Sequence, residues 1–324
     1  MKLQVLIPQY NEGEEVLSPL LNSIALQQSV SMDEVGVVIA NDGGEVILST
    51  EFLESFPFRV DYLQCEHRGV SATRNACLDT ATADYVMFCD ADDMFYNMCG
   101  LYIIFREMEG DGFNALVSVF IEESRDPNTK APLYLNHNMD STFVHGKVYR
   151  RSYLTSNNIR WNDALTVHED SYFNCLAQKC TTVVKYCQQP FYLWKWRDGS
   201  VCRHDPKYIL KTYNNMLESS TALVRELLSR GKETEAMFYA TAMIYDAYYT
   251  MNKAEWMNQE NQEYRLATER RFKAYMDDFQ GLFDRIQPEA RNQIIMSIKG
   301  RFFGEGVFLE SVTFDDWIKH VREL

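Results

Sequence analysis

The first half of the chain alternates short apolar runs with segments whose apolar residues recur at nearly helical spacing. Residues 3–8 and 35–40 are apolar except for Gln4, and residues 14–28 between them carry apolar side chains on one helical face. Short, nearly continuous apolar runs are typical of strands that are buried on both faces of a parallel sheet. Residues 3–40 therefore predict a βαβ unit.

The same alternation continues along the chain. It predicts strands over residues 59–64 and 85–89, with a helix over residues 70–81 between them, and two more strands over 114–120 and 182–187. The fold class is therefore α/β. Ligand sites of such folds gather at the carboxyl ends of the strands. Polar clusters stand at three of these ends, namely residues 9–12, 41–44 and 90–93.

The pattern changes after Pro206. Residues 210–230, 233–251 and 262–279 have helical periodicity, with Gly231 and Gly281 as expected breaks. Before this region, residues 121–141 lack a helical period and hold two prolines, so we expect an excursion there that can include a hairpin. The sequence thus predicts an α/β domain over residues 1–204 and an α-helical region over residues 205–324.

The composition of the chain limits which molecules we expect it to bind and in which cellular compartment we expect it. The formal net charge of −14 repels polyanions, which argues against nucleic acid and anionic membranes as partners. The eight cysteines form no CxxC pair, and we expect reduced thiols. The first apolar run is too short for a signal peptide, and no segment approaches the ~20 apolar residues of a membrane span. We expect a cytoplasmic protein without a transmembrane segment.

The strongest chemical signal is FCDADD, residues 88–93, at the end of a predicted strand. Asp90 and Asp92 are separated by one residue and can face one hard cation such as Mg²⁺ or Mn²⁺, and Asp93 follows as a less certain third carboxylate. A cation there would neutralise a departing phosphate. The alternative is an acidic turn or a helix cap without a metal.

The acidic motif is part of a longer pattern of four segments in a fixed order. They are IPQYNE (7–12), NDGG (41–44), the stretch from 68 to 93, and HED (168–170). Their order and spacing over residues 3–204 resemble the family 2 glycosyltransferases. The resemblance implies a GT-A fold, which is a Rossmann-like domain for nucleotide-diphospho-sugars. It also implies an inverting, metal-assisted transfer of sugar from a nucleotide sugar, in particular a UDP-sugar, to an acceptor hydroxyl. Asn41 and Gly44 depart from the family pattern, which usually has Asp and Ser there.

The resemblance assigns individual residues to the donor. Tyr10 is expected near the uracil, Asp42 at the base, and Arg74 at the base or the diphosphate, where a guanidinium fork suits the oxygens. A core ring for Tyr10 and a helix-surface role for Arg74 are the alternatives. The full expected donor set is Pro8, Tyr10, Asn11, Glu12, Asp42, Arg74, Asp90, Ala91, Asp92, Trp196 and Arg197.

The resemblance also assigns the metal and the base. Asp92 is expected as the principal metal ligand, Asp90 as a ligand that also lies near the ribose, and His204 as a further ligand, with a structural histidine as the alternative for His204. Asp170 is expected as the general base on the acceptor hydroxyl. Its alternative role is that of an acid at a helix N-terminus, where the dipole favours it.

Other residues follow from family position. Residues 192–204 are expected to form a loop that closes over donor and acceptor, with Trp194 or Trp196 on a sugar ring and Arg197 or Arg203 on the diphosphate. His145 and Lys147 are expected either at the acceptor pocket or in a solvated loop.

Two other classes remain open. One is a sugar nucleotidyltransferase, although the acidic QYNEGEE after the first strand lacks the glycine-rich, basic loop that such an enzyme needs. The other is a non-catalytic module that binds sugar nucleotides. The acceptor stays open among carbohydrate, lipid-linked and protein acceptors.

Overall fold

The computed structural model describes residues 1–138, 140–198, 205, 207–304 and 312–324. The chain forms two compact units, Met1–Ser200 and Val201–Leu324, and each is described by itself.

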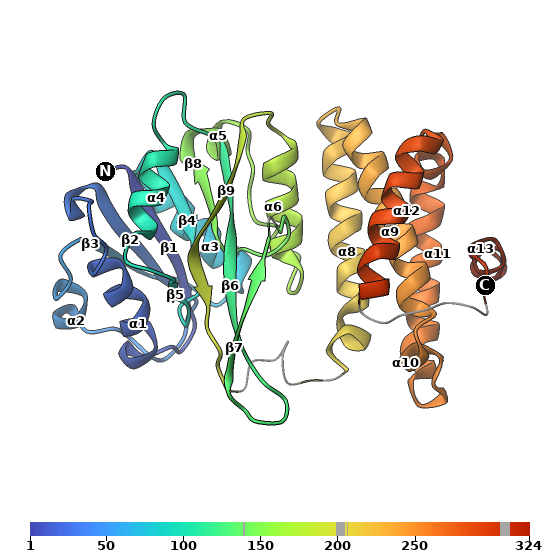
Figure 1. The fold of residues 1–324 in the computed structure, drawn as a ribbon, viewed down its shortest axis with the longest axis horizontal. Helices are drawn as coiled ribbons and strands as arrows, with labels where there is room; N and C mark the ends of the chain where they lie inside the picture. Colours follow the sequence, from blue (N-terminus) through green and yellow to red (C-terminus); the bar gives the residue numbers. More distant parts are fainter. Residues whose placement is uncertain (139, 199–204, 206, 305–311) are drawn as a thin grey trace. The chain divides into compact units, whose positions relative to one another are not determined.

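The described part of the first unit is built on one sheet of nine strands. Its order is β3-β2-β1-β4-β8-β6-β9-β5, and β7 pairs with β6. The strands are β1 (Leu3–Gln9), β2 (Val35–Asn41), β3 (Arg59–Gln64), β4 (Tyr85–Phe88), β5 (Met94–Phe95), β6 (Ala115–Arg125), β7 (Pro132–His137), β8 (Lys147–Arg150) and β9 (Val184–Trp194). Figure 1 shows the sheet with its helices.

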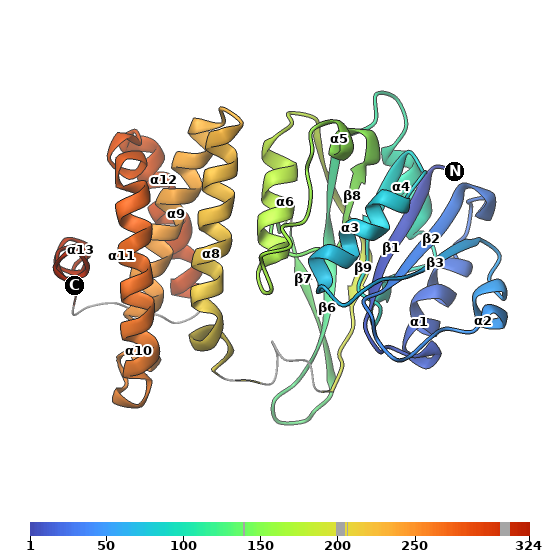
Figure 2. The same ribbon diagram turned by 180° about the vertical axis from the view of Figure 1, so that it is seen from behind.

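Helices cover both faces of this sheet (Figures 1 and 2). They are α1 (Glu14–Ala25), α2 (Thr50–Glu54), α3 (Val70–Thr80), α4 (Gly100–Glu107), α5 (Arg151–Ser156) and α6 (Glu169–Lys179), and a 3-10 turn spans Met32–Glu34. Alternate side chains of a strand point to opposite faces. Val5 and Ile7 of β1 therefore pack in one core with α1 and α4, whereas Phe88 of β4 meets Phe173 of α6 on the other face.

The prediction of parallel strands is confirmed for the six predicted strands, and the sheet also contains antiparallel strands that the sequence pattern did not predict. Strands β1, β2, β3 and β4 pair in parallel. Strand β8 runs antiparallel to both β4 and β6, so it is a reversed strand between them, and β6 and β9 keep the direction of β4. The predicted hairpin is confirmed, because β7 pairs antiparallel with β6 from Pro132 opposite Arg125 to His137 opposite Phe120.

The last strand is longer than its apolar run suggested. Strand β9 continues past Cys187 to Trp194 and pairs with β6 across a register shift between Ser118 and Phe120. Tyr192 and Trp194, which the sequence placed in a closing loop, are therefore strand residues. The shift lets the strand resume its pairing after the Gln188-Gln189-Pro190 interruption.

The second unit is helical in its described residues. Its helices are α8 (Tyr208–Ser229), α9 (Glu233–Met251), α10 (Ala254–Met257), α11 (Gln262–Arg285), α12 (Pro288–Gly304) and α13 (Phe314–Glu323), with a 3-10 turn at Gln259–Asn261. Gly231 has a φ of +70° and separates α8 from α9, as predicted. The break expected at Gly281 is wrong, because α11 runs through it to Arg285. The buried Phe279, Leu282 and Phe283 on that turn offset the cost of a helical glycine, about 1 kcal/mol.

Among the described helices, none combines the length and the apolar character that a membrane crossing requires.

Candidate functional site

The three polar clusters predicted at strand ends meet at the carboxyl edge of β1, β2 and β4. The backbone N–H of Asp42 donates to the carbonyl of Gln9 at 2.8 Å, which joins the ends of β2 and β1. Asn11 has a left-handed backbone with a φ of 64°. Its Oδ1 accepts a hydrogen bond from the backbone N–H of Glu45 at 2.7 Å, so the first two motifs share one network.

The NDGG turn is held by its own side chains. Asn41 Oδ1 accepts from the N–H of Gly44 at 2.7 Å, and Asn41 Nδ2 donates to the Gly44 carbonyl at 3.1 Å. Gly43 has a φ of +72°, and a Cβ there would lie 2.6 Å from the backbone nitrogen of His67. Asn41, the departure from the family pattern, thus organises the turn through contacts that an aspartate, which has no N–H to donate, cannot make in full.

The side chain of Asp42 has a structural role, because it binds the backbone at the start of α3. Its carboxylate accepts from the backbone N–H groups of Arg68 at 2.9 Å and Gly69 at 3.0 Å, at the start of α3. Nδ1 of His67 lies 2.9 Å from the same carboxylate. A carboxylate at a helix N-terminus is favoured by the helix dipole. Asp42 therefore fixes the position of α3, and α3 carries Arg74.

Tyr10 is half exposed and stacks on His67, with ring centroids 4.8 Å apart and planes inclined by 26°. The alternative of a core ring is therefore wrong for Tyr10. Its backbone N–H donates to Glu12 Oε2 at 2.5 Å. Pro8 lies in β1 opposite Ala40 of β2, one residue before the sheet edge.

Arg74 joins the acidic turn to the HED segment. Its guanidinium donates to Asp90 at 2.7 Å and to Glu169 at 2.8 Å, and it lies over the ring of Trp161 with 4.4 Å to the centroid. Its side chain is only 5% exposed, which excludes the role of an ordinary surface arginine. Burial disfavours its charge, but Asp90 and Glu169 outweigh this effect and raise the pKa of Arg74.

The carboxyl groups of the DADD turn differ in electrostatics. Burial opposes the charge of Asp90, but the Arg74 guanidinium, which is hydrogen-bonded to it, outweighs burial and lowers the pKa of Asp90. Burial and the neighbouring Asp90 raise the pKa of Asp92, whose side chain is 32% exposed. Ala91 between them is buried in the core and holds the turn down.

Asp93 belongs to a buried polar group. Its carboxylate accepts from the Tyr192 hydroxyl at 2.5 Å and from the backbone N–H of Lys195 at 2.9 Å. Burial, with Asp90 and Asp92 nearby, raises the pKa of Asp93 well above its usual range. His145 Nδ1 lies 3.6 Å from Asp93, and burial lowers the pKa of His145 to about 3, so this imidazole is neutral.

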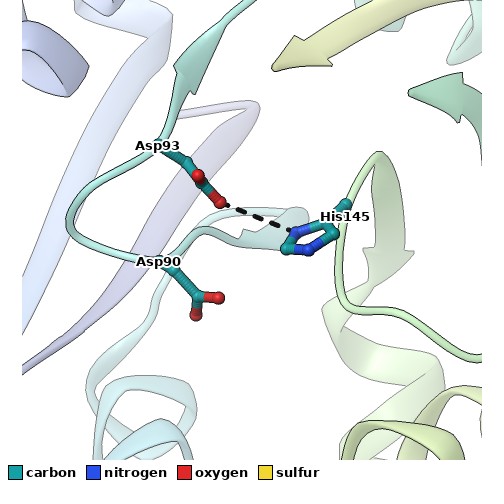
Figure 3. A group of neighbouring side chains, drawn as sticks. All are labelled: Asp90, Asp93 and His145. Carbon is teal, nitrogen blue, oxygen red and sulfur yellow. Dashed lines mark ion pairs between the residues drawn. The ribbon is translucent and has the colours of Figure 1, made fainter. Parts of the chain in front are cut away.

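One ligand atom from each of Asp90, Asp93 and His145 lies within 4.8 Å of the others (Figure 3). Carboxylate oxygens and a neutral imidazole nitrogen fit a divalent cation such as Mn²⁺ or Mg²⁺ at this end of β4. Asp92, the expected principal ligand, lies on the same turn and pairs with Arg197 at 3.1 Å. The expected ligand His204 and also Arg203 lie outside the described residues.

Asp170 lies in the first turn of α6, and its Oδ1 accepts from the N–H of Ser171 at 2.7 Å. Burial and the adjacent Glu169 raise the pKa of Asp170 to about 7, although Arg74 opposes the shift. A carboxyl group with a pKa near neutrality is suited to proton transfer. The two interpretations of Asp170 are therefore compatible, because a residue that begins the helix also carries a pKa typical of a general base.

The segment after β9 lies beside the acidic turn. Arg197 pairs with Asp92 at 3.1 Å and lies 3.8 Å from Glu12, so its guanidinium lies between the acidic turn and the end of β1. Trp196 Nε1 donates to Asp198 at 3.1 Å, and Arg125 lies over the Trp196 ring. Trp194 instead packs on His145, with 4.9 Å between ring centroids.

Lys147 is buried, not part of a solvated loop, and its Nζ donates to the carbonyl of Phe143. Burial lowers the pKa of Lys147 to about 8, and Asp140 and Asp170 oppose the shift. His145 is likewise 4% exposed, which makes the solvated-loop alternative wrong for both residues.

Sequence reasoning missed three contributors. They are Trp161 under Arg74, Tyr192 on Asp93, and His67 on Tyr10. Trp161 and Tyr192 carry no local motif, and only tertiary contact identifies them. His67 stands just before the helix that the sequence predicted, so its position beside the strand end was a usable signal.

Comparisons with known proteins agree with this geometry. The glycosyltransferase GlyA of Streptococcus pneumoniae is 28% identical over 229 residues, which are 62% of this chain and 32% of GlyA. The poly(ribitol-phosphate) β-N-acetylglucosaminyltransferase TarS of Staphylococcus aureus is 26% identical over 192 residues, 55% of this chain and 32% of TarS. The chain thus spans about a third of the length of these two curated relatives.

Solved structures show the same fold. TarS 1–349 from S. aureus in complex with UDP superposes with a TM-score of 0.61 at 16% identity, over 97% of this chain and 94% of that one. The mannosyltransferase PcManGT from Pyrobaculum calidifontis, in complex with GDP-Man and Mn²⁺, gives 0.50 at 14% identity over 88% of each chain. The α/β unit is therefore a GT-A fold, followed by helices. Residues 4–171 match the family described as glycosyl transferase family 2, and the chain belongs to this family.

Proposed function

We propose that the protein is an inverting glycosyltransferase that moves a sugar from a UDP-sugar to an acceptor hydroxyl with the help of Mn²⁺ or Mg²⁺. The observation that carries the proposal is the double ion pair of Arg74 with Asp90 and Glu169. Glu169 immediately precedes Asp170, so one buried guanidinium brings the acidic turn for the donor next to the carboxylate proposed as the base.

The donor would lie along the edge of β1, β2 and β4. The exposed ring of Tyr10 offers a face to the uracil, and the Asp42 turn lies beside it through His67. Arg197 would bind the diphosphate, because its guanidinium faces Asp92 and Glu12 at the end of the same edge. Relatives support this choice of donor, since TarS has been solved with UDP and with UDP-GlcNAc.

Asp90 and Asp92 would hold the metal. A divalent cation bound there supplies charge neutralisation for the departing nucleoside diphosphate. Arg74 keeps Asp90 ionised, which a hard cation requires of its ligand. Asp170 would accept the proton of the acceptor hydroxyl as that oxygen attacks the anomeric carbon, and this single displacement inverts the configuration.

Sugar transfer is tested by incubating the full chain with a panel of nucleotide sugars and Mn²⁺. We expect one UDP-sugar to raise the Tm, because a ligand of the folded state stabilises it, and to release UDP slowly in the absence of an acceptor. With an acceptor, NMR of the product should show the inverted anomer. A retained anomer would refute the single displacement.

The other two classes give different outcomes in the same assays. A sugar nucleotidyltransferase would consume a nucleoside triphosphate and release pyrophosphate. A binding module would raise its Tm with a UDP-sugar but release no UDP. The pKa of Asp170, near 7, favours catalysis over binding alone, because a purely binding site needs no proton acceptor.

The remaining assignments stay predictions. We propose residues 1–204 as the catalytic domain and residues 205–324 as a helical region that serves the acceptor or a partner. A carbohydrate, a lipid-linked sugar or a protein is the acceptor, and the negative charge of the chain argues against nucleic acid. The cytoplasmic location inferred from the sequence also stays a prediction.

A further inference from the structure

Asp93 differs from the two aspartates before it on the same turn. Asp90 and Asp92 have side chains that are 33% and 32% exposed, whereas Asp93 is 1% exposed. Both oxygens of Asp93 already accept hydrogen bonds, one from the Tyr192 hydroxyl and one from the backbone N–H of Lys195. Its carboxylate is therefore directed at the end of β9.

Tyr192 and His145 complete this buried group. The Tyr192 hydroxyl also accepts from the backbone N–H of Asp90 at 3.3 Å, so one hydroxyl contacts both Asp90 and Asp93. His145 faces Asp93, with Nδ1 directed at its carboxylate (Figure 3). Its ring packs against Tyr192 and Trp194, each with 4.9 Å between centroids, which fixes its orientation. Nδ1 is buried and lacks a hydrogen-bond partner among the described residues.

The same group positions the segment that follows β9. Lys195 is bound to Asp93 through its backbone, and two residues later Arg197 pairs with Asp92. The acidic turn and the arginine proposed for the diphosphate therefore meet through two neighbouring contacts. A shift of the Asp93 carboxylate would therefore also shift the backbone of Lys195 and, with it, the position of Arg197.

We propose that Asp93, Tyr192 and His145, here called the Asp93 anchor, are positioning residues that place Asp90, Asp92 and Arg197 for the metal and the diphosphate without binding either. The inference rests on the proposed function. Removal of a group that hydrogen-bonds to a metal ligand, without binding the metal, typically lowers metal affinity about 10- to 100-fold.

Direct metal binding by Asp93 and His145 is the competing interpretation, and the variant Tyr192→Phe separates the two. If Asp93 binds the metal, loss of the hydroxyl frees one of its oxygens, and affinity stays equal or rises. If the anchor positions the turn, Asp90 and Asp93 lose their shared contact, and affinity falls by about tenfold.

The experiment is calorimetric titration of the full chain with UDP, with and without Mn²⁺. The matched control is Tyr213→Phe, because Tyr213 is 2% exposed and its hydroxyl donates to the carboxylate of Asp246 at 2.7 Å in the helical unit. We expect both variants to lower the Tm by similar amounts. Only Tyr192→Phe should weaken the Mn²⁺-dependent binding of UDP, by about tenfold, with the metal-free affinity unchanged.

Unchanged or tighter Mn²⁺-dependent binding in folded Tyr192→Phe would overturn the inference. If that variant does not fold, His145→Phe keeps a ring in the stack and removes the nitrogen that faces Asp93. A loss of a few-fold there supports the anchor, whereas complete loss of Mn²⁺-dependent binding identifies His145 as a ligand and refutes it. Wild-type protein that binds no UDP with Mn²⁺ would instead refute the proposed function itself.

Discussion

The variant Glu169→Gln tests whether Asp170 is a base with a pKa set by its neighbours. Burial and Glu169 raise this pKa to about 7, while Arg74 opposes them. Glutamine removes the negative neighbour. It also leaves more of the positive charge of Arg74 uncompensated, because Glu169 pairs with Arg74 at 2.8 Å. Both effects stabilise the carboxylate of Asp170, so its pKa must fall.

The expected size follows from ordinary electrostatics. Loss of one adjacent charge in a partly buried site changes a pKa by about one unit, or about 1.4 kcal/mol. A base with a pKa near 7 is about one-tenth ionised at pH 6, whereas a base with a pKa near 6 is about half ionised. When the rate of each protein at pH 6 is divided by that protein's own maximal rate, the fraction should therefore be about fivefold larger for Glu169→Gln than for wild type. The maximal rate itself should fall, because a weaker base takes the proton less readily.

The assay is the pH profile of kcat/KM between pH 5 and 9, with Mn²⁺ and the donor identified by the Tm screen. Asp79→Asn is the matched control, since it also removes a carboxylate that pairs with an arginine, here Arg160, at an exposed position of α3. Its profile should coincide with that of the wild type. An acidic limb that stays in place in folded Glu169→Gln would refute Asp170 as the titrating base.

Three further variants test the surrounding electrostatics. Asp92→Asn should abolish the Mn²⁺-dependent part of UDP binding in calorimetry without lowering the Tm, and unchanged binding would reject Asp92 as a ligand. Asp170→Asn should raise the Tm at pH 8 but not at pH 4. The reason is that a folded pKa of about 7 exceeds the usual carboxyl value, so stability is lost as the pH rises between the two; an equal change at both values would contradict this. Arg74→Ala should cost about 3 to 5 kcal/mol in urea unfolding, because two carboxylates lose a buried partner, and a cost below about 1 kcal/mol would contradict the ion-pair argument.

The sequence predicted the first half of the sheet because β1, β2 and β4 are mostly apolar and helical segments alternate with the strands. Residues 59–64 became β3 with the predicted bounds, and residues 35–40 became β2 with one residue added. The prediction stopped short in β9, where Gln188-Gln189-Pro190 interrupts the apolar pattern and the register shift opposite Ser118 restores it. Local periodicity contains no information about such a shift, because the partner strand determines it.

The candidate site was predictable in its motifs but not in its contacts. Asp42, Arg74 and Asp90 carry the family resemblance; Asp42 and Asp90 follow the ends of β2 and β4, and Arg74 reaches Asp90 from α3. The bond from Arg74 to Glu169 joins residues 95 positions apart, and no local pattern indicates that they meet. Trp161 and Tyr192 were missed for the same reason, since a single aromatic residue predicts burial without indicating which residue it contacts.

The acidic turn shows that neighbouring residues of one motif can lie in different environments, so each residue must be assigned its function separately. Within four residues, Arg74 lowers the pKa of Asp90 against the effect of burial, whereas burial raises the pKa of Asp93 well above its usual range. A carboxyl group that remains ionised suits a cation, and one that is enclosed by Tyr192 and Lys195 suits the support of its neighbours. We therefore propose different roles for Asp90 and Asp93 within this one motif. The difference arises from Arg74 on α3, which donates to the carboxylate of Asp90, and from Tyr192 on β9, which donates to the carboxylate of Asp93.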